Sequence, residues 1–121
     1  MEWPELDALK ERMRDFAERR NWDQFHAPKN LVMALAGEAG ELIEHFQWLT
    51  ESESASLEPR ALEEVAAEIA DIQIYLARLS DKLGVSIADA VEKKIAENER
   101  KYPVEQSWGS ARKYTEYDAN H

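Results

Sequence analysis

The feature that most constrains the fold is an apolar stripe in the second half of the chain. Its members recur at alternating spacings of four and three residues: Val65, Ile69, Ile72, Leu76, Leu79 and Leu83. At about 3.6 residues per turn, this spacing places all six side chains along one face of a helix. Pro59 suits the first turn of that helix, and Gly84 suits its C-terminal end. The sequence therefore predicts a long amphipathic helix that begins at Pro59 and ends near Leu83.

Three other segments carry apolar residues with helical spacing. The first begins near Pro4 and ends at about residues 19–22, and the second begins at Pro28 with a stripe that reaches Leu49. The last begins after Ser86 and runs to Tyr102, whereas the polar stretch 50–58 has no period and indicates a loop. No segment alternates with period two over a useful length. We therefore expect an all-α, four-helix fold in one domain, residues 1–121, with a helical core at about 4–102 and an irregular tail at about 103–121.

Composition excludes several classes of function. Of the 121 residues, 33% are charged and 44% hydrophobic, which is typical of a folded soluble protein. The formal net charge of -10 argues against broad DNA or RNA binding, because phosphate contacts need a basic surface. No apolar stretch approaches the roughly 20 residues that span a bilayer, and the N-terminus does not resemble a signal peptide. We expect a cytoplasmic protein with no nucleic-acid or membrane partner.

Two acid-x-x-acid pairs border the apolar stripes: Glu38 with Glu41, and Glu68 with Asp71. Spacing alone is no evidence, because the acidic composition gives about five such pairs by chance and six occur. Their position is more informative. Glu41, Glu68 and Asp71 each directly precede an apolar stripe residue, so they lie at the edge of the buried face. Each of two helices therefore offers a carboxylate pair beside the core.

Four carboxylates that face one another repel strongly unless a cation neutralises them. Hard oxygen ligands favour Mg²⁺ or Mn²⁺, and two such cations would roughly balance four charges. The residues alone leave open the alternative that both pairs are solvated helix faces with basic partners. A di-iron bundle is disfavoured, because that design needs Glu-x-x-His on two helices.

Several segments, in order, resemble the MazG-like, all-α nucleoside triphosphate pyrophosphohydrolases. They are "GEAGE", then "EIAD" 27 residues after Glu41, and the flanking "NWDQFHAPKN", "KKIAENERKYPV" and "ARKYTEY". Together they are similar to the dCTP pyrophosphatase subgroup. The resemblance implies hydrolysis between the α- and β-phosphates, giving a monophosphate and pyrophosphate. It also implies that Mg²⁺, with Mn²⁺ as a substitute, is held by Glu38, Glu41, Glu68 and Asp71. One carboxylate should accept the proton of the attacking water, and we favour Glu38.

The resemblance also suggests substrate-binding residues. Lys94 and Asn98 would contact phosphate and sugar, with Arg100 and Lys101 as helpers. The residues suggested for base recognition are Trp22, His26, Trp48 and Tyr75. Each has a structural alternative, since lysines are commonly solvated and aromatic residues at helical spacing commonly belong to a core. Met13 stands where vertebrate members of the subgroup carry a histidine, which leaves base preference open.

From the resemblance, we expect a housecleaning pyrophosphatase that acts on dCTP or a modified dCTP. A related enzyme of different base preference and a non-catalytic helical binding module are the alternatives. The stripe of the third predicted helix is longer than the fourth helix can cover, so a second copy of the chain is the simplest partner. The family likewise forms dimers and, in this subgroup, tetramers. We expect a homotetramer, or else a homodimer, with sites that use residues of more than one chain.

Overall fold

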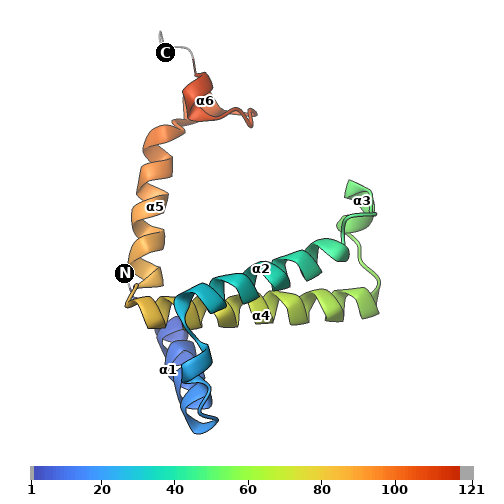
Figure 1. The fold of residues 1–121 in the computed structure, drawn as a ribbon. Coiled ribbons are helices and arrows are strands. Elements are labelled where there is room, and N and C mark those ends of the chain that lie inside the picture. The colour runs from blue at the N-terminus through green and yellow to red at the C-terminus, as the bar shows by residue number, and fades with distance from the viewer. Residues whose placement is uncertain (1, 118–121) are drawn as a thin grey trace. The chain divides into compact units, whose positions relative to one another are not determined.

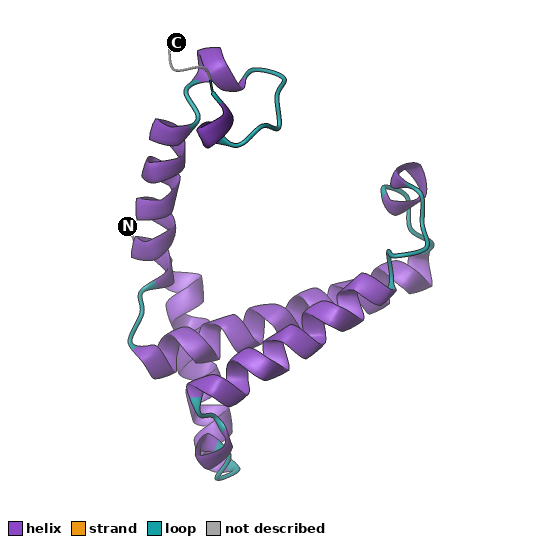
Figure 2. Cartoon of the chain, turned by 45° about the horizontal axis from the view of Figure 1, so that its top comes forward, coloured by secondary structure: helices purple, strands orange, loops and turns teal. Residues whose placement is uncertain are grey.

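The computed structural model describes residues 2–117, and all regular structure in that range is helical (Figures 1 and 2). Four of its α-helices have 15 or more residues: α1 (Pro4–Arg19), α2 (Pro28–Glu44), α4 (Pro59–Leu83) and α5 (Ile87–Lys101). Between and after them lie four short elements: η1 (Asp23–Phe25), α3 (Glu51–Ser54), α6 (Val104–Ser107) and η2 (Tyr114–Glu116). The all-α prediction is confirmed for this part of the chain.

Proline and glycine set the ends of the long helices, as predicted. Pro4, Pro28 and Pro59 each open a helix, where the missing N–H costs nothing because first-turn amides have no partner within the helix. Gly84 ends α4 with a left-handed φ of 67°, which carries little strain without a Cβ atom. The amide of Val85 then donates to the carbonyl of Ser80 at 2.9 Å, which closes the helix end.

Helix α2 is shorter than its apolar stripe predicted. It ends at Glu44, and the amides of Phe46 and Gln47 both donate to the carbonyl of Ile43 at 2.9 Å. The following residues form turns, so Trp48 lies beyond the helix. The predicted continuation of this helix along a stripe that reaches Leu49 is therefore wrong.

The predicted loop 50–58 contains the one-turn helix α3, because its N-terminus is capped. Thr50 accepts a hydrogen bond from the Glu53 amide at 3.1 Å, and the Glu53 side chain accepts one from the Thr50 amide at 2.9 Å. This reciprocal capping box satisfies two amides that would otherwise lack partners. A helix of four residues is too short to show a period, so the Thr-x-x-Glu spacing was the only available signal.

The chain divides into two compact units. The first, Trp3–Ser86, contains α1 to α4; α2 packs along α4, and α1 packs against α4 as well (Figures 1 and 2). Its buried apolar residues are few and mostly small: Ala17, Leu31, Val65 and Ala77. The single-domain organisation over residues 1–121 stays a prediction.

The second unit contains α5 and the segment after it. In the predicted irregular tail, α6 and η2 are short helical turns, and the ring of Tyr102 makes edge-on contacts with Tyr114 and Tyr117 at 6.1 and 5.9 Å. The tail is therefore partly ordered by aromatic packing; residues 118–121 lie outside the described range. No helix within residues 2–117 is long and apolar enough to cross a membrane.

Candidate metal centre and nucleotide pocket

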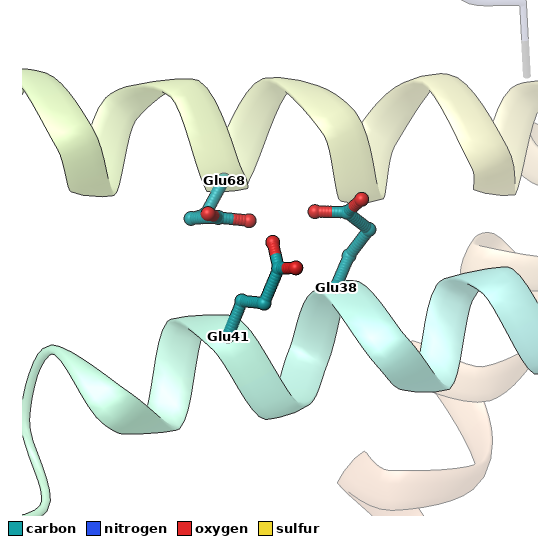
Figure 3. Close-up of side chains that lie close together, drawn as sticks. All are labelled: Glu38, Glu41 and Glu68. Carbon is teal, nitrogen blue, oxygen red and sulfur yellow. The ribbon is translucent and has the colours of Figure 1, made fainter.

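Three glutamates from two neighbouring helices form an acidic cluster. Glu38 and Glu41 extend from α2 towards α4, and Glu68 extends from α4 towards them (Figure 3). One carboxylate oxygen from each lies within 4.8 Å of the other two. Glu38 and Glu68 are half-buried, whereas Glu41 is exposed. The packing of α2 along α4 therefore brings three of the four predicted metal ligands together.

The cluster lacks a positive counter-charge among the described residues. The Oε2 atoms of Glu38 and Glu68 are both buried, and neither has a hydrogen-bond partner in residues 2–117. Two ionised carboxylates cannot bond to each other, because neither carries a hydrogen. A protonated Glu38 can share its hydrogen with the Glu68 carboxyl, which raises the pKa of Glu38, and burial and the charge of Asp71 raise it further. Buried, unpartnered hard oxygens at this spacing fit a divalent cation such as Mg²⁺ or Mn²⁺.

Asp71 lies apart from the three-glutamate cluster, one turn beyond Glu68 on α4. It lines an adjacent cavity, and its charge still raises the pKa of Glu38. Its role as a fourth ligand stays a prediction. The position of Asp71 nevertheless joins the acidic cluster to the cavity wall.

The cavity has a volume of about 160 Å³. Its walls come from α1, α2, α4 and the two residues that flank η1, all within the first unit. They consist of Met13, Phe16, Trp22, His26, Leu31, Asp71, Ile74, Tyr75 and Arg78. An apolar cavity of about 150 Å³ in another protein holds one benzene ring, so this volume matches a single six-membered ring. An apolar pocket with a few polar groups is typical of small-molecule sites.

The structure brings together three of the four predicted base-binding residues, since Trp22, His26 and Tyr75 all line the cavity. Trp22 packs edge-on against Phe16, with ring centroids 5.7 Å apart, which fixes the indole. Trp48 does not line the cavity, and 86% of its surface is exposed. Any contact between Trp48 and a base in this cavity therefore needs a rearrangement or another chain.

Arg78, which no sequence motif singles out, is 3% exposed and lines the cavity. Its guanidinium donates from Nε to His26 Nδ1 at 3.0 Å, from Nη2 to Asp23 at 2.5 Å and from Nη1 to Asp81 at 3.2 Å. The available signal was an arginine placed between two residues of the apolar stripe, Leu76 and Leu79. Burial, and then the positive charge of Arg78, lower the pKa of His26.

The predicted phosphate-binding residues lie on α5, in the second unit. Lys94 and Lys101 both approach Glu97, at 3.7 and 2.7 Å. Asn98 and Arg100 are exposed on the same helix. The structure does not place this helix relative to the acidic cluster, so the phosphate-binding role of these four residues stays a prediction.

Comparison with known families identifies the MazG-like family over residues 34–117. The match contains both acidic pairs and spans well over half of the chain. The chain belongs to the MazG-like family. The resemblance of "GEAGE" and "EIAD" to that family is thereby confirmed.

Curated relatives and a solved structure agree with this membership. The chain is 43% identical to dCTP pyrophosphatase 1 of Bos taurus and 41% identical to dCTP pyrophosphatase 1 of Homo sapiens. Each alignment covers 93% of this chain and 68% of the relative. A pyrophosphatase from Archaeoglobus fulgidus superposes with a TM-score of 0.78 at 38% identity, over 85% of this chain and 96% of the other.

Proposed function

We propose that this MazG-like chain hydrolyses dCTP or a modified dCTP between the α- and β-phosphates, in a Mg²⁺-dependent reaction. Its enzyme class, nucleotide pyrophosphohydrolase, follows from its family and from relatives that are themselves pyrophosphatases. One observation carries the proposal: a cluster of three glutamates lies beside a cavity with the volume of one six-membered ring. A pyrimidine nucleotide fits such a pair of sites, with phosphates at the cluster and base in the cavity.

The acidic cluster supplies the chemistry. Glu38, Glu41 and Glu68 would hold the cation, with Asp71 beside them. When bound, Mg²⁺ neutralises phosphate charge and acidifies the attacking water. Glu38 would accept the proton of the attacking water, since it belongs to the cluster that would hold the cation. Little else is needed, because phosphoryl transfer depends mainly on positioning and charge neutralisation.

The cavity supplies base recognition. Trp22 and Tyr75 offer aromatic faces to a flat ring, and base–aromatic stacking contributes roughly 1–3 kcal/mol per base. The choice of dCTP comes from the names of the curated relatives. Met13 lines the cavity with a thioether, which cannot read a base edge as an imidazole can. A panel of canonical and 5-modified deoxynucleotides therefore belongs in the first assay, with Mg²⁺ present.

Hydrolysis of dCTP in ¹⁸O-labelled water is expected to place the label in the monophosphate. Attack at the α-phosphorus releases pyrophosphate in one step, so neither dCDP nor inorganic phosphate should accumulate. Mass spectrometry of both products reports where the oxygen entered. Label found only in pyrophosphate would mean attack at the β-phosphorus, and absence of any hydrolysis across the panel would favour a non-catalytic binding module.

We also propose that the chain works as a homotetramer, or else as a homodimer. Helix α4 carries four apolar side chains at intervals of seven residues, each between 39% and 56% exposed: Leu62, Ile69, Leu76 and Leu83. A seven-residue apolar repeat on one face is typical of helices that pack against another helix along their length. The exposed repeat supports the expectation that a second copy covers this helix.

A composite site would explain why Trp48 is exposed and does not line the cavity of its own chain. Glu41→Gln subunits lack a metal ligand, and Trp48→Ala subunits lack a stacking surface for a neighbour. If Trp48 serves the neighbouring chain, co-refolding the two inactive variants should restore roughly a quarter of the wild-type activity in a randomly mixed dimer. Variants mixed without unfolding, which prevents exchange, are the control. Activity that stays at the level of the separate variants would place each site within one chain.

A further inference from the structure

A buried arginine fixes the hydrogen-bonding state of His26. Arginine has five N–H donors, no acceptor, and stays protonated at all relevant pH values. Because Arg78 Nε donates to His26 Nδ1 at 3.0 Å, that ring nitrogen must present a lone pair. The hydrogen of the neutral imidazole must then be on Nε2. His26 is therefore a hydrogen-bond donor through its second nitrogen.

Arg78 itself is held by charged residues from η1 and α4. Asp23 of η1 and Asp81 of α4 accept from its two terminal nitrogens. Asp81 also accepts two hydrogen bonds from Arg14 of α1, and Asp23 accepts one from Lys82 of α4. With 4% of its side chain exposed and all three kinds of nitrogen bonded, Arg78 has no freedom to release the imidazole.

The surroundings keep His26 neutral. Burial lowers its pKa first, and the charges of Arg78 and Lys82 lower it further, against the opposing charge of Asp23. A protonated imidazole would place a hydrogen on Nδ1, opposite the Arg78 N–H, where two donors cannot bond. The donor state on Nε2 is thus the stable one.

We propose that Arg78 is a positioning residue that fixes His26 as a hydrogen-bond donor in the cavity, where it binds an acceptor on the ring edge of the base. This inference rests on the proposed function, since it places a nucleotide base in the cavity. Apart from His26 and Arg78, the polar wall consists of Asp71 and the polar groups of Trp22 and Tyr75. Cytosine offers two acceptors on its edge, the ring nitrogen N3 and the carbonyl O2. Thymine also carries O2 but has a hydrogen on N3, so only a contact to N3 would distinguish the two bases.

The tautomer can be measured without any activity. The chain has three histidines, so a two-bond ¹H–¹⁵N correlation spectrum contains few imidazole signals. The set of signals that disappears in His26→Gln belongs to His26. In the wild type we expect an unprotonated Nδ1 and a protonated Nε2 for His26. In Arg78→Met, which removes the donor but keeps a long side chain, the signals should shift towards a mixture of tautomers. A protonated Nδ1 in the wild type would overturn the inference, whether or not the Met variant folds.

Kinetics with altered bases test the selection. 3-Deaza-dCTP lacks the N3 acceptor, and a 2-aminopyridine C-nucleoside triphosphate keeps the ring nitrogen but lacks O2. We expect the wild type to hydrolyse one of these analogues with about 10-fold lower kcat/KM than dCTP, which corresponds to one lost hydrogen bond. The two arms separate recognition of N3 from recognition of O2. Wild-type enzyme that hydrolyses both analogues as well as dCTP would overturn the inference.

Substitutions separate positioning from general support of the fold. In His26→Phe and Arg78→Met, discrimination against the sensitive analogue should fall to about 2-fold or less. Arg78→Lys keeps an N–H donor and should recover part of the discrimination. A purely structural role for Arg78 would lower kcat/KM for all substrates equally and leave the ratio unchanged, which would contradict the proposal. If the wild type hydrolyses no nucleotide, the proposed function fails, and the imidazole spectrum alone decides the role of Arg78.

Discussion

Replacing Glu68 by glutamine is expected to abolish hydrolysis and, at the same time, to stabilise the protein without metal. The amide has nearly the same shape as the carboxylate but removes one charged ligand from the cluster of Glu38, Glu41 and Glu68. Loss of that charge should lower kcat/KM by about 10³-fold or more, since several kcal/mol of metal-dependent stabilisation is lost. Without a cation, the same change relieves repulsion at buried oxygens that have no partner in the described chain.

Two measurements test this pair of effects. Steady-state kinetics over a Mg²⁺ series reports the activity, and urea unfolding in EDTA reports the stability. Glu63→Gln is the matched control, because Glu63 is an exposed glutamate of the same helix outside the cluster. Near-wild-type turnover of Glu68→Gln at saturating Mg²⁺ would show that the metal assignment is wrong. Destabilisation in EDTA would instead show that the carboxylate has a favourable partner.

The fold was predictable wherever a local signal acts over several turns. Helix α4, which carries the long apolar stripe, begins at Pro59 and ends at Leu83, just before Gly84, as predicted. The end of α2 was not predictable in the same way, because the apolar residues Phe46 and Leu49 continue the stripe after the helix ends. Apolar spacing indicates which residues prefer burial but not where the backbone leaves the helix; Phe46 is half-buried in the turn after α2, whereas Leu49 is exposed.

The site was predictable as a set of residues but less so as an arrangement. The acidic pairs were found from their place beside the stripes, whereas the aromatic set came from resemblance to the family. The packing of α2 on α4 then brings Glu68 to Glu38 and Glu41 and places Asp71 on the cavity wall. The Arg78 network depends on contacts with Asp23 and His26, more than 50 residues away in the chain, and no local pattern encodes those contacts.

Replacing Asp81 by asparagine is expected to destabilise the protein and to remove part of its sensitivity to acid. Hydrogen bonds from Arg14, followed by the charges of Arg14 and Arg78, lower the pKa of Asp81 below its usual value, and only 13% of its side chain is exposed. A carboxylate whose pKa is lower in the folded state stabilises that state above its unfolded pKa of about 3.9. The stabilisation is lost as the pH falls through the lower, folded pKa.

At pH 7 we expect the variant to lose about 2 kcal/mol of unfolding free energy, because buried Arg78 keeps only Asp23 as an ionised partner. Urea unfolding between pH 7 and pH 2.5 should show this difference shrinking below about pH 4. The control is Asp15→Asn, which breaks an exposed ion pair with Arg19 and should change stability by less than about 0.5 kcal/mol. A difference between wild type and Asp81→Asn that stays constant across the pH range would mean that the aspartate acts through its shape alone.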